Sequence, residues 1–348
     1  MNIQNRMDFF HVPGISVTYF ADGTLQWNKY LGILESGSDN NVSANSIFHA
    51  CSISKMITAL CVLRLVQDNK LSLYTDVNEY LTEWNIPDSE LLKEKKVTLA
   101  NLLSHQAGFC DIEGSFEPYR NGDSIPKPID ILRGTTIYHK EEVQVKYAPE
   151  TDFVYSDAGY CIIAQIVHDV LGETISQLAK RYIFEPLGLK KTFFWEVGAE
   201  SLFGDSFDAT DCAFGHNSSG NIVEEKRAIY SNIEGAALWT TPYELSTIAL
   251  DLMASYNDAN GTILNSEMAK HMMTPYGASD FACLGIFYDR KGDYYFSQGW
   301  GIGMQCKMCL YPSTKKGIVV MTNSDPGMEQ NKALVGEVIS YVCVNGRI

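Results

Sequence analysis

The clearest hydrophobic pattern is an apolar helical stretch that begins shortly after residue 50. Apolar side chains there recur three and four residues apart, which predicts a helix ending near residues 68–70. These side chains are Ile53, Met56, Ile57, Leu60, Leu63 and Val66. Similar patterns predict helices over 158–171, over 242–256, from about 266, and over about 329–342.

Strand patterns occur at both ends of the chain. Residues 15–20 and 25–27 read as a hairpin around a turn at 21–23, and another short strand runs towards Phe48. Four more strands are predicted over 283–288, 294–298, 304–311 and 317–322. Strands at both ends with helices between them predict an α+β fold, in which one antiparallel sheet is assembled from both termini and flanked by helices.

The middle of the chain differs from both ends in its predicted elements. Short helical patterns at 76–81, 98–103 and 158–171 stand among long polar loops. We therefore expect a discontinuous sheet domain formed by residues 1–75 and 216–348, and a mostly helical insertion domain formed by residues 76–215.

Composition and charge narrow the class of partner. The 348 residues carry a formal net charge of −15, which disfavours a nucleic-acid partner and a polybasic membrane contact. Neither a signal peptide nor a run long enough to span a membrane is visible, and nine scattered cysteines suit a reducing, cytoplasmic location. Cys306 and Cys309 should point to opposite faces of a strand, so we expect no zinc site there.

The pair Ser52 and Lys55 is the first candidate for chemistry. A Ser-x-x-Lys at the start of a helix brings a hydroxyl and an amine onto one face, beside free backbone N–H groups. Such an environment suits a serine nucleophile, although this spacing also arises by chance. The second Ser-x-x-Lys, Ser313 to Lys316, reads as a turn between strands and is discarded.

Two further stretches follow downstream. Tyr155-Ser156-Asp157 precedes a helix, and its tyrosine is either catalytic or an ordinary core or rim aromatic. A short-chain dehydrogenase would need a lysine four residues after Tyr155, where this chain has Gly159. The stretch 297–303 is rich in glycine but leads into a strand rather than a helix, which excludes a dinucleotide loop. It reads as a substrate-contacting strand edge or as a bulged edge strand.

Together these motifs resemble the serine β-lactamase and penicillin-binding-protein superfamily, most closely its class C branch. Ser-x-x-Lys, a tyrosine triplet and a Lys/His-x-Gly strand occur in that order. Four more segments look like family segments, at residues 11–17, 102–109, 185–192 and 235–242. The resemblance implies a β-lactamase/transpeptidase-like fold.

The resemblance also implies roles for site residues. Ser52 would be the acylated nucleophile, Lys55 would take its proton, and Tyr155 would act as general base and acid. The backbone N–H groups of Ser52 and Trp300 would form the oxyanion hole. The substrate would meet four other residues, namely Asp157, Ser297, Gln298 and Gly299. Two of these depart from the family pattern, because Asp157 replaces the usual Asn and Ser297 the usual Lys or His.

The function implied is a serine hydrolase that works through an acyl-enzyme on a small-molecule ester, amide or peptide, with no metal or organic cofactor. The alternatives are a D-alanyl-D-alanine carboxypeptidase, a β-lactamase proper, or a non-catalytic penicillin-binding-like sensor. The oligomeric state is open. Several other polar residues are interpreted as structural or solvated rather than catalytic: His105, His216, Asp205, Asp208 and Asp211.

Overall fold

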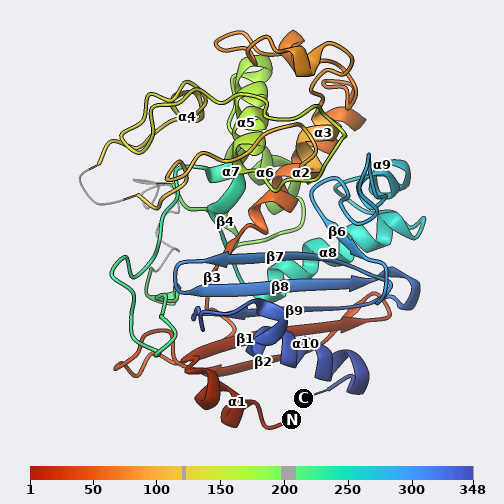
Figure 1. The fold of residues 1–348 in the computed structure, drawn as a ribbon. Coiled ribbons are helices and arrows are strands. Elements are labelled where there is room, and N and C mark those ends of the chain that lie inside the picture. The colour runs from red at the N-terminus through yellow and green to blue at the C-terminus, as the bar shows by residue number, and fades with distance from the viewer. Residues whose placement is uncertain (120–122, 197–208, 348) are drawn as a thin grey trace.

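The computed structural model describes residues 1–119, 123–196 and 209–347, and it confirms the α+β class. Its main sheet has six antiparallel strands in the order β2-β1-β9-β8-β7-β6, so strands from both termini lie side by side (Figure 1). The strands are β1 (Gly14–Ala21), β2 (Thr24–Gly32), β6 (Phe287–Asp289), β7 (Tyr294–Gly301), β8 (Met304–Tyr311) and β9 (Lys316–Thr322). The predicted sheet built from both ends of the chain is therefore confirmed.

Helices cover both faces of this sheet. Helix α8 (Pro242–Tyr256) packs in the larger apolar core, whereas α1 (Ile3–Phe10) and α10 (Leu334–Asn345) pack in a second core on the opposite face. Cys306 belongs to the first core and Cys309 to the second, so these cysteines do point to opposite faces. Because both faces of the sheet are covered, β8 is buried almost throughout.

A second, three-stranded sheet was not predicted. Its order is β3-β5-β4, with β3 (Phe48–Cys51), β5 (Leu238–Thr240) and β4 (Phe193–Phe194). The strand expected near Phe48 thus pairs with β5 instead of joining the main sheet. It leads directly into α2 (Ser54–Gln67), and this short connection places the start of α2 beside the main sheet.

The remaining α-helices lie on the other side of the molecule from α1 and α10 (Figure 1). They are α3 (Leu99–Leu103), α4 (Pro128–Leu132), α5 (Asp157–Leu171), α6 (Ile175–Ala179), α7 (Ile233–Ala236) and α9 (Ser266–Met272). The Ser156 hydroxyl caps α5 by accepting a hydrogen bond from the Gly159 N–H, and Gly172 ends the helix in the left-handed conformation. The division into a sheet domain and an insertion at 76–215 stays a prediction.

Two predicted elements are shorter than expected. The helix predicted at 76–81 is a single 3-10 turn, Val77–Glu79, and the strand predicted at 283–288 begins only at Phe287. Gly285 has a left-handed φ of 83°, and its N–H donates to Leu103 O, so the chain turns around α3 before it can join the sheet. Across the described part of the chain, no helix is long and apolar enough to cross a membrane.

Candidate active site

Ser52 lies in the tight turn that joins β3 to α2. The helix begins at Ser54, so Ser52 precedes it and Lys55 occupies its first turn, a small correction to the predicted position of Ser52 inside the helix. Cys51 has a left-handed φ of 47°, and the Ser54 hydroxyl donates to Cys51 O at 2.5 Å and accepts from Leu238 N at 2.9 Å. These contacts fix the turn on which Ser52 is presented.

Lys55 is buried against an anion. Its Nζ donates to Asp157 Oδ1 at 2.6 Å and to Gly235 O at 2.9 Å, and it lies 4.9 Å from the ring centroid of Tyr155. Burial alone would lower the pKa of Lys55, but the charge of Asp157 and the hydroxyl of Tyr155 outweigh it and raise this pKa above its usual range. Lys55 is therefore an ammonium at neutral pH.

Asp157 is held in place from two other segments. Asn232 Nδ2 donates to its Oδ1 at 2.8 Å, and its backbone N–H donates to Asp111 Oδ2 at 2.9 Å. Gly235 is also required here, because an added Cβ would come within 2.6 Å of Asp157 Oδ1 and 3.3 Å of Lys55 Nζ. The carboxylate, the amine and the chain at Gly235 thus form one close-packed unit.

Tyr155 stands between Lys55 and solvent. Its side chain is 37% exposed, and its ring stacks on His105 with centroids 4.3 Å apart. Ser52 and Lys55 both act on its hydroxyl in the direction that favours the phenolate. Burial raises the pKa of Tyr155, whereas the ammonium of Lys55 works in the opposite direction by favouring the phenolate.

His105 supports Tyr155 from behind. The backbone N–H of Ser156 donates to His105 Nδ1 at 3.2 Å, and burial together with the nearby Lys55 lowers the pKa of His105 to about 3. The imidazole is therefore neutral and hydrogen-bonded, in keeping with the structural interpretation of this residue. His216 is likewise buried, between Asn323 O and the Ser36 N–H.

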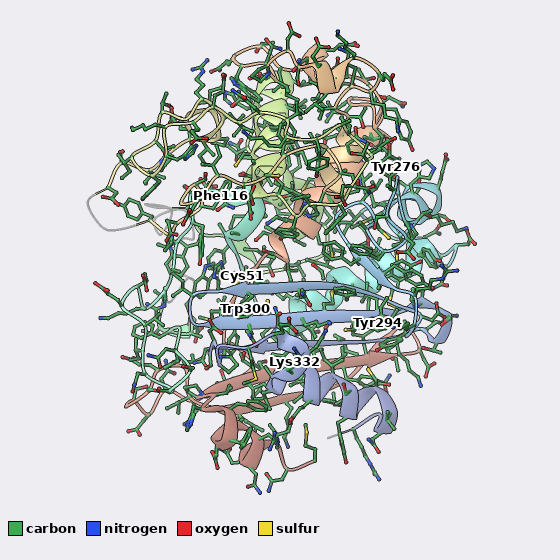
Figure 2. All side chains as sticks on the ribbon, in the orientation of Figure 1. Cys51, Phe116, Tyr276, Tyr294, Trp300 and Lys332 are labelled. Carbon is green, nitrogen blue, oxygen red and sulfur yellow. The ribbon has the colours of Figure 1, made fainter. Side chains whose placement is uncertain are left out.

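The glycine-rich stretch forms the free edge of β7 beside Ser52. Strand β6 pairs only with residues 294–296 of β7, which leaves residues 297–301 unpaired by β6. The end of β3 at Cys51 lies close to this edge and to Trp300 (Figure 2). An added Cβ on Gly299 would come within 2.2 Å of Ala50 O, so only glycine permits this approach.

Two adjoining spaces open around Ser52. The inner one is small and is lined by Ser52, Lys55, Tyr155, Ser297 and neighbouring groups. The outer one holds about 390 Å³. Its lining consists of Ser52, Phe153, Tyr155, Phe281, Phe287, Phe296, Gln298, Trp300 and Gln330. The structure therefore brings residues from all three motifs to these two spaces. Asp157 and Gly299 line neither space, although Asp157 contacts Lys55 directly.

Sequence reasoning missed several members of this site. Asp111 and Asn232 both hold Asp157, and neither belongs to one of the three motifs. Asn232 lies just before the 235–242 segment, which was the one available signal.

Asp205 and Asp208 lie outside the described residues, and Asp211 lies in a 3-10 turn, Ala209–Asp211. In the described ranges, no group of three or more His, Cys, Asp or Glu side chains is placed to hold a metal ion.

Comparison with known proteins gives a match over most of the chain. The Beta-lactamase family model matches residues 2–338. Penicillin-binding protein 4 of Amycolatopsis lactamdurans is 30% identical over 184 residues, which are 52% of this chain and 45% of that protein. An unguisins hydrolase of Aspergillus violaceofuscus is 26% identical over 201 residues, 55% of this chain and 33% of its own. The chain thus spans less than half the length of these curated relatives.

Solved structures share the fold. The D-amino acid amidase from Ochrobactrum anthropi superposes with a TM-score of 0.75 over 100% of both chains at 19% identity. The octameric penicillin-binding protein homologue from Pyrococcus abyssi gives a TM-score of 0.76 over 99% of this chain and 76% of its own, at 20% identity. The predicted β-lactamase/transpeptidase-like fold is therefore confirmed.

Proposed function

Because this chain belongs to the beta-lactamase family, we propose that it is a serine hydrolase that cleaves small esters, amides or peptides through an acyl-enzyme on Ser52. The observation that carries this proposal is the meeting of Ser52, Lys55 and Tyr155 in one pocket at the free edge of β7. A serine hydroxyl needs an adjacent base to act as a nucleophile.

The proton acceptor in this proposal is Tyr155. A lysine that is already an ammonium cannot accept a proton, and the raised pKa of Lys55 therefore favours Tyr155 over the role that the sequence suggested for Lys55. Tyr155 accepts a proton only as its phenolate, and the positive charge of Lys55 favours that form against burial, which raises the pKa of Tyr155. Asp157 in turn keeps Lys55 charged and in position.

The reaction then proceeds in two halves. Ser52 Oγ bonds to the carbonyl carbon, its proton passes to Tyr155, and the bond to the leaving group breaks as Tyr155 returns that proton to the leaving group. Water next attacks the acyl-enzyme, Tyr155 accepts its proton, and Ser52 Oγ leaves with a proton. The backbone N–H groups of Ser52 and Trp300 would stabilise the oxyanion, each contributing about 3–4 kcal/mol.

The site favours uncharged substrates. Ser297 supplies no cation, and the ammonium of Lys55 is already paired with Asp157. Lys307 on β8 is 2% exposed and donates to Asn331 Oδ1 at 2.7 Å. Lys307 is not among the described residues that line either space around Ser52. A carboxypeptidase or a β-lactamase proper binds a substrate carboxylate, so we rank both below an esterase or amidase of neutral substrates.

A serine-reactive probe tests the proposal. We expect a fluorophosphonate to label one peptide, the one containing Ser52, and we expect Ser52→Ala to lose the label and to lower ester hydrolysis by at least about a thousandfold. Ser313→Ala, in the other Ser-x-x-Lys, is the matched control and should change neither result. Absence of any adduct on wild-type protein would instead favour a non-catalytic binding module.

A further inference from the structure

A wall of four phenylalanines stands beside the proposed nucleophile. Phe153 precedes α5, Phe281 lies in the loop after α9, and Phe287 and Phe296 face each other across β6 and β7. Ring centroids lie 4.8 Å apart for Phe153 and Phe281, and 5.5 Å apart for Phe287 and Phe296. All four line the outer space next to Ser52. We call this set the phenylalanine wall.

The phenylalanine wall faces an outer space whose described lining is uncharged. Of the described residues that line the outer space, none is acidic or basic, and the polar ones are Ser52, Tyr155, Gln298, Trp300 and Gln330. Lys307 Nζ does lie 4.5 Å from the ring centroid of Phe296, but it is buried and bonded to Asn331. Phe281 nevertheless leaves 39% of its surface exposed, which is apolar surface available to a bound group.

The wall lies on the side of the proton donor. Tyr155 stacks on His105, whose ring centroid lies 5.8 Å from that of Phe153 and 6.1 Å from that of Phe287. The Trp300 N–H lies four residues along β7 from Phe296, roughly 13 Å at the usual strand rise. A group that must receive a proton from Tyr155 as it departs is therefore directed towards the phenylalanine wall, at the other end of this stretch of β7 from the Trp300 N–H.

Building on the proposed function, we propose that the phenylalanine wall binds the leaving group of the substrate, and that this leaving group is an uncharged aromatic or bulky apolar alcohol or amine. It departs as the neutral alcohol or amine, carrying the proton that Tyr155 received from Ser52. Burying a carboxylate against these rings would cost free energy because none of the described residues that line the outer space carries a positive charge. Covering about 55 Å² of apolar surface corresponds to roughly a tenfold gain in binding.

Two matched series of esters test the assignment. In the first, the acyl group is always butyryl and the alcohol is ethanol, 2-phenylethanol or 2-(4-carboxyphenyl)ethanol. In the second, the alcohol is always ethanol and the acyl group is butyryl or 3-phenylpropanoyl. Values of kcat/KM are measured for the wild type, Phe281→Ala, and the control Phe9→Ala, which removes a phenylalanine on α1 that is 64% exposed.

We expect the wild type to prefer the 2-phenylethyl ester over the ethyl ester by about tenfold, and Phe281→Ala to reduce this ratio to about threefold or less. The carboxylated ester should be the poorest of its series. Phe9→Ala should behave as the wild type, and the acyl-group ratio should be the same in all three proteins. Phe281→Leu, which restores apolar surface, should recover part of the preference. This variant separates the loss of apolar surface in Phe281→Ala from a loss of folding.

Three results would overturn the assignment while leaving the hydrolase intact: equal turnover of the ethyl and 2-phenylethyl esters, a preference for the carboxylated ester, or an effect of Phe281→Ala confined to the acyl series. Absence of ester turnover together with absence of a Ser52 adduct would overturn the proposed function itself, and the leaving-group assignment with it.

Discussion

At the scale of single residues, the chemistry depends on the buried pair of Lys55 and Asp157. The pair is satisfied on both sides, since Gly235 O accepts from Lys55 and Asn232 donates to Asp157. Breaking such a pair typically costs about 3–5 kcal/mol when one charge is left alone. The family motif usually has Asn where this chain has Asp157, so an amide is a size-matched replacement that removes only the charge.

Asp157→Asn should therefore move the pH–rate profile towards lower pH. The carboxylate favours the ammonium form of Lys55 and raises its pKa, so its loss lowers that pKa. The same carboxylate also raises the pKa of Tyr155, so in the variant the limb that depends on the Tyr155 phenolate appears at lower pH. The measurement is kcat/KM from pH 5 to 10, with Asp22→Asn in the exposed β1–β2 turn as control. Superimposable profiles would show that Asp157 does not couple to the proton-transfer groups.

Ser297 leads to a second prediction at this scale. A charge-assisted contact contributes about 1.5–3 kcal/mol, and a neutral hydroxyl about half of that or less. A peptide with an amidated C-terminus should thus be cleaved at least as fast as the same peptide with a free carboxylate, as measured by product release under matched conditions. A free acid cleaved tenfold faster would mean that another cation replaces the missing one.

At the scale of elements, the short helix α7 links the site to the protein interior. Asn232 and Gly235 contact the ion pair from its two ends, and Glu234 between them is only 1% exposed. The Thr58 hydroxyl donates to Glu234 O at 2.8 Å and ties α7 to α2. Within the described part of the chain, Glu234 Oε1 has no hydrogen-bond partner, so the ionised carboxylate is costly to bury.

Glu234→Gln should make stability less dependent on pH. Burial raises the pKa of Glu234 from 4.5 to about 7, so the folded state holds this proton more tightly than the unfolded state does. The contribution of this protonated carboxyl to the free energy of unfolding is fully present below pH 4.5 and is lost as the pH rises through about 7. It amounts to roughly 3 kcal/mol.

Urea unfolding at pH 5 and pH 8 measures this effect. The variant should lose less free energy of unfolding than the wild type between the two pH values, whereas Glu94→Gln, in an exposed loop, should match the wild type. An identical loss in Glu234→Gln would show that another group carries the pH dependence.

At the scale of the whole molecule, the net charge of −15 acts on every approaching substrate. Its field extends about 30 Å at 0.01 M salt but only about 8 Å at 0.15 M. Anionic substrates are therefore repelled at low salt, and neutral ones are not.

We expect kcat/KM for an ester with a carboxylate on its leaving group to rise as NaCl is increased from about 10 to about 200 mM, because the screening length shortens. The kcat/KM of the uncharged ester should change by less than about twofold. Equal salt dependence for both esters would point to a general effect of salt on the protein rather than to long-range repulsion.

The sequence by itself determined the features that depend on local periodicity and short motifs. The helix predicted at 242–256 is α8, the strands predicted at 304–311 and 317–322 are β8 and β9, and the opposite orientation of Cys306 and Cys309 followed from alternation alone. These predictions are correct because side chains on one buried face recur every 2 residues in a strand and every 3.6 residues in a helix.

Only the tertiary structure decided which distant segments meet. Lys55 and Asp157 are 102 positions apart, and Asn232 reaches them from a third segment, so no local pattern shows their distances or the resulting pKa values. The same holds for three other features. The small sheet includes β3, and the turn at Gly285 means that β6 begins only at Phe287. The members of the phenylalanine wall come from three separate regions. These features arise from contacts between residues far apart in sequence, where packing and hydrogen bonding override local propensity.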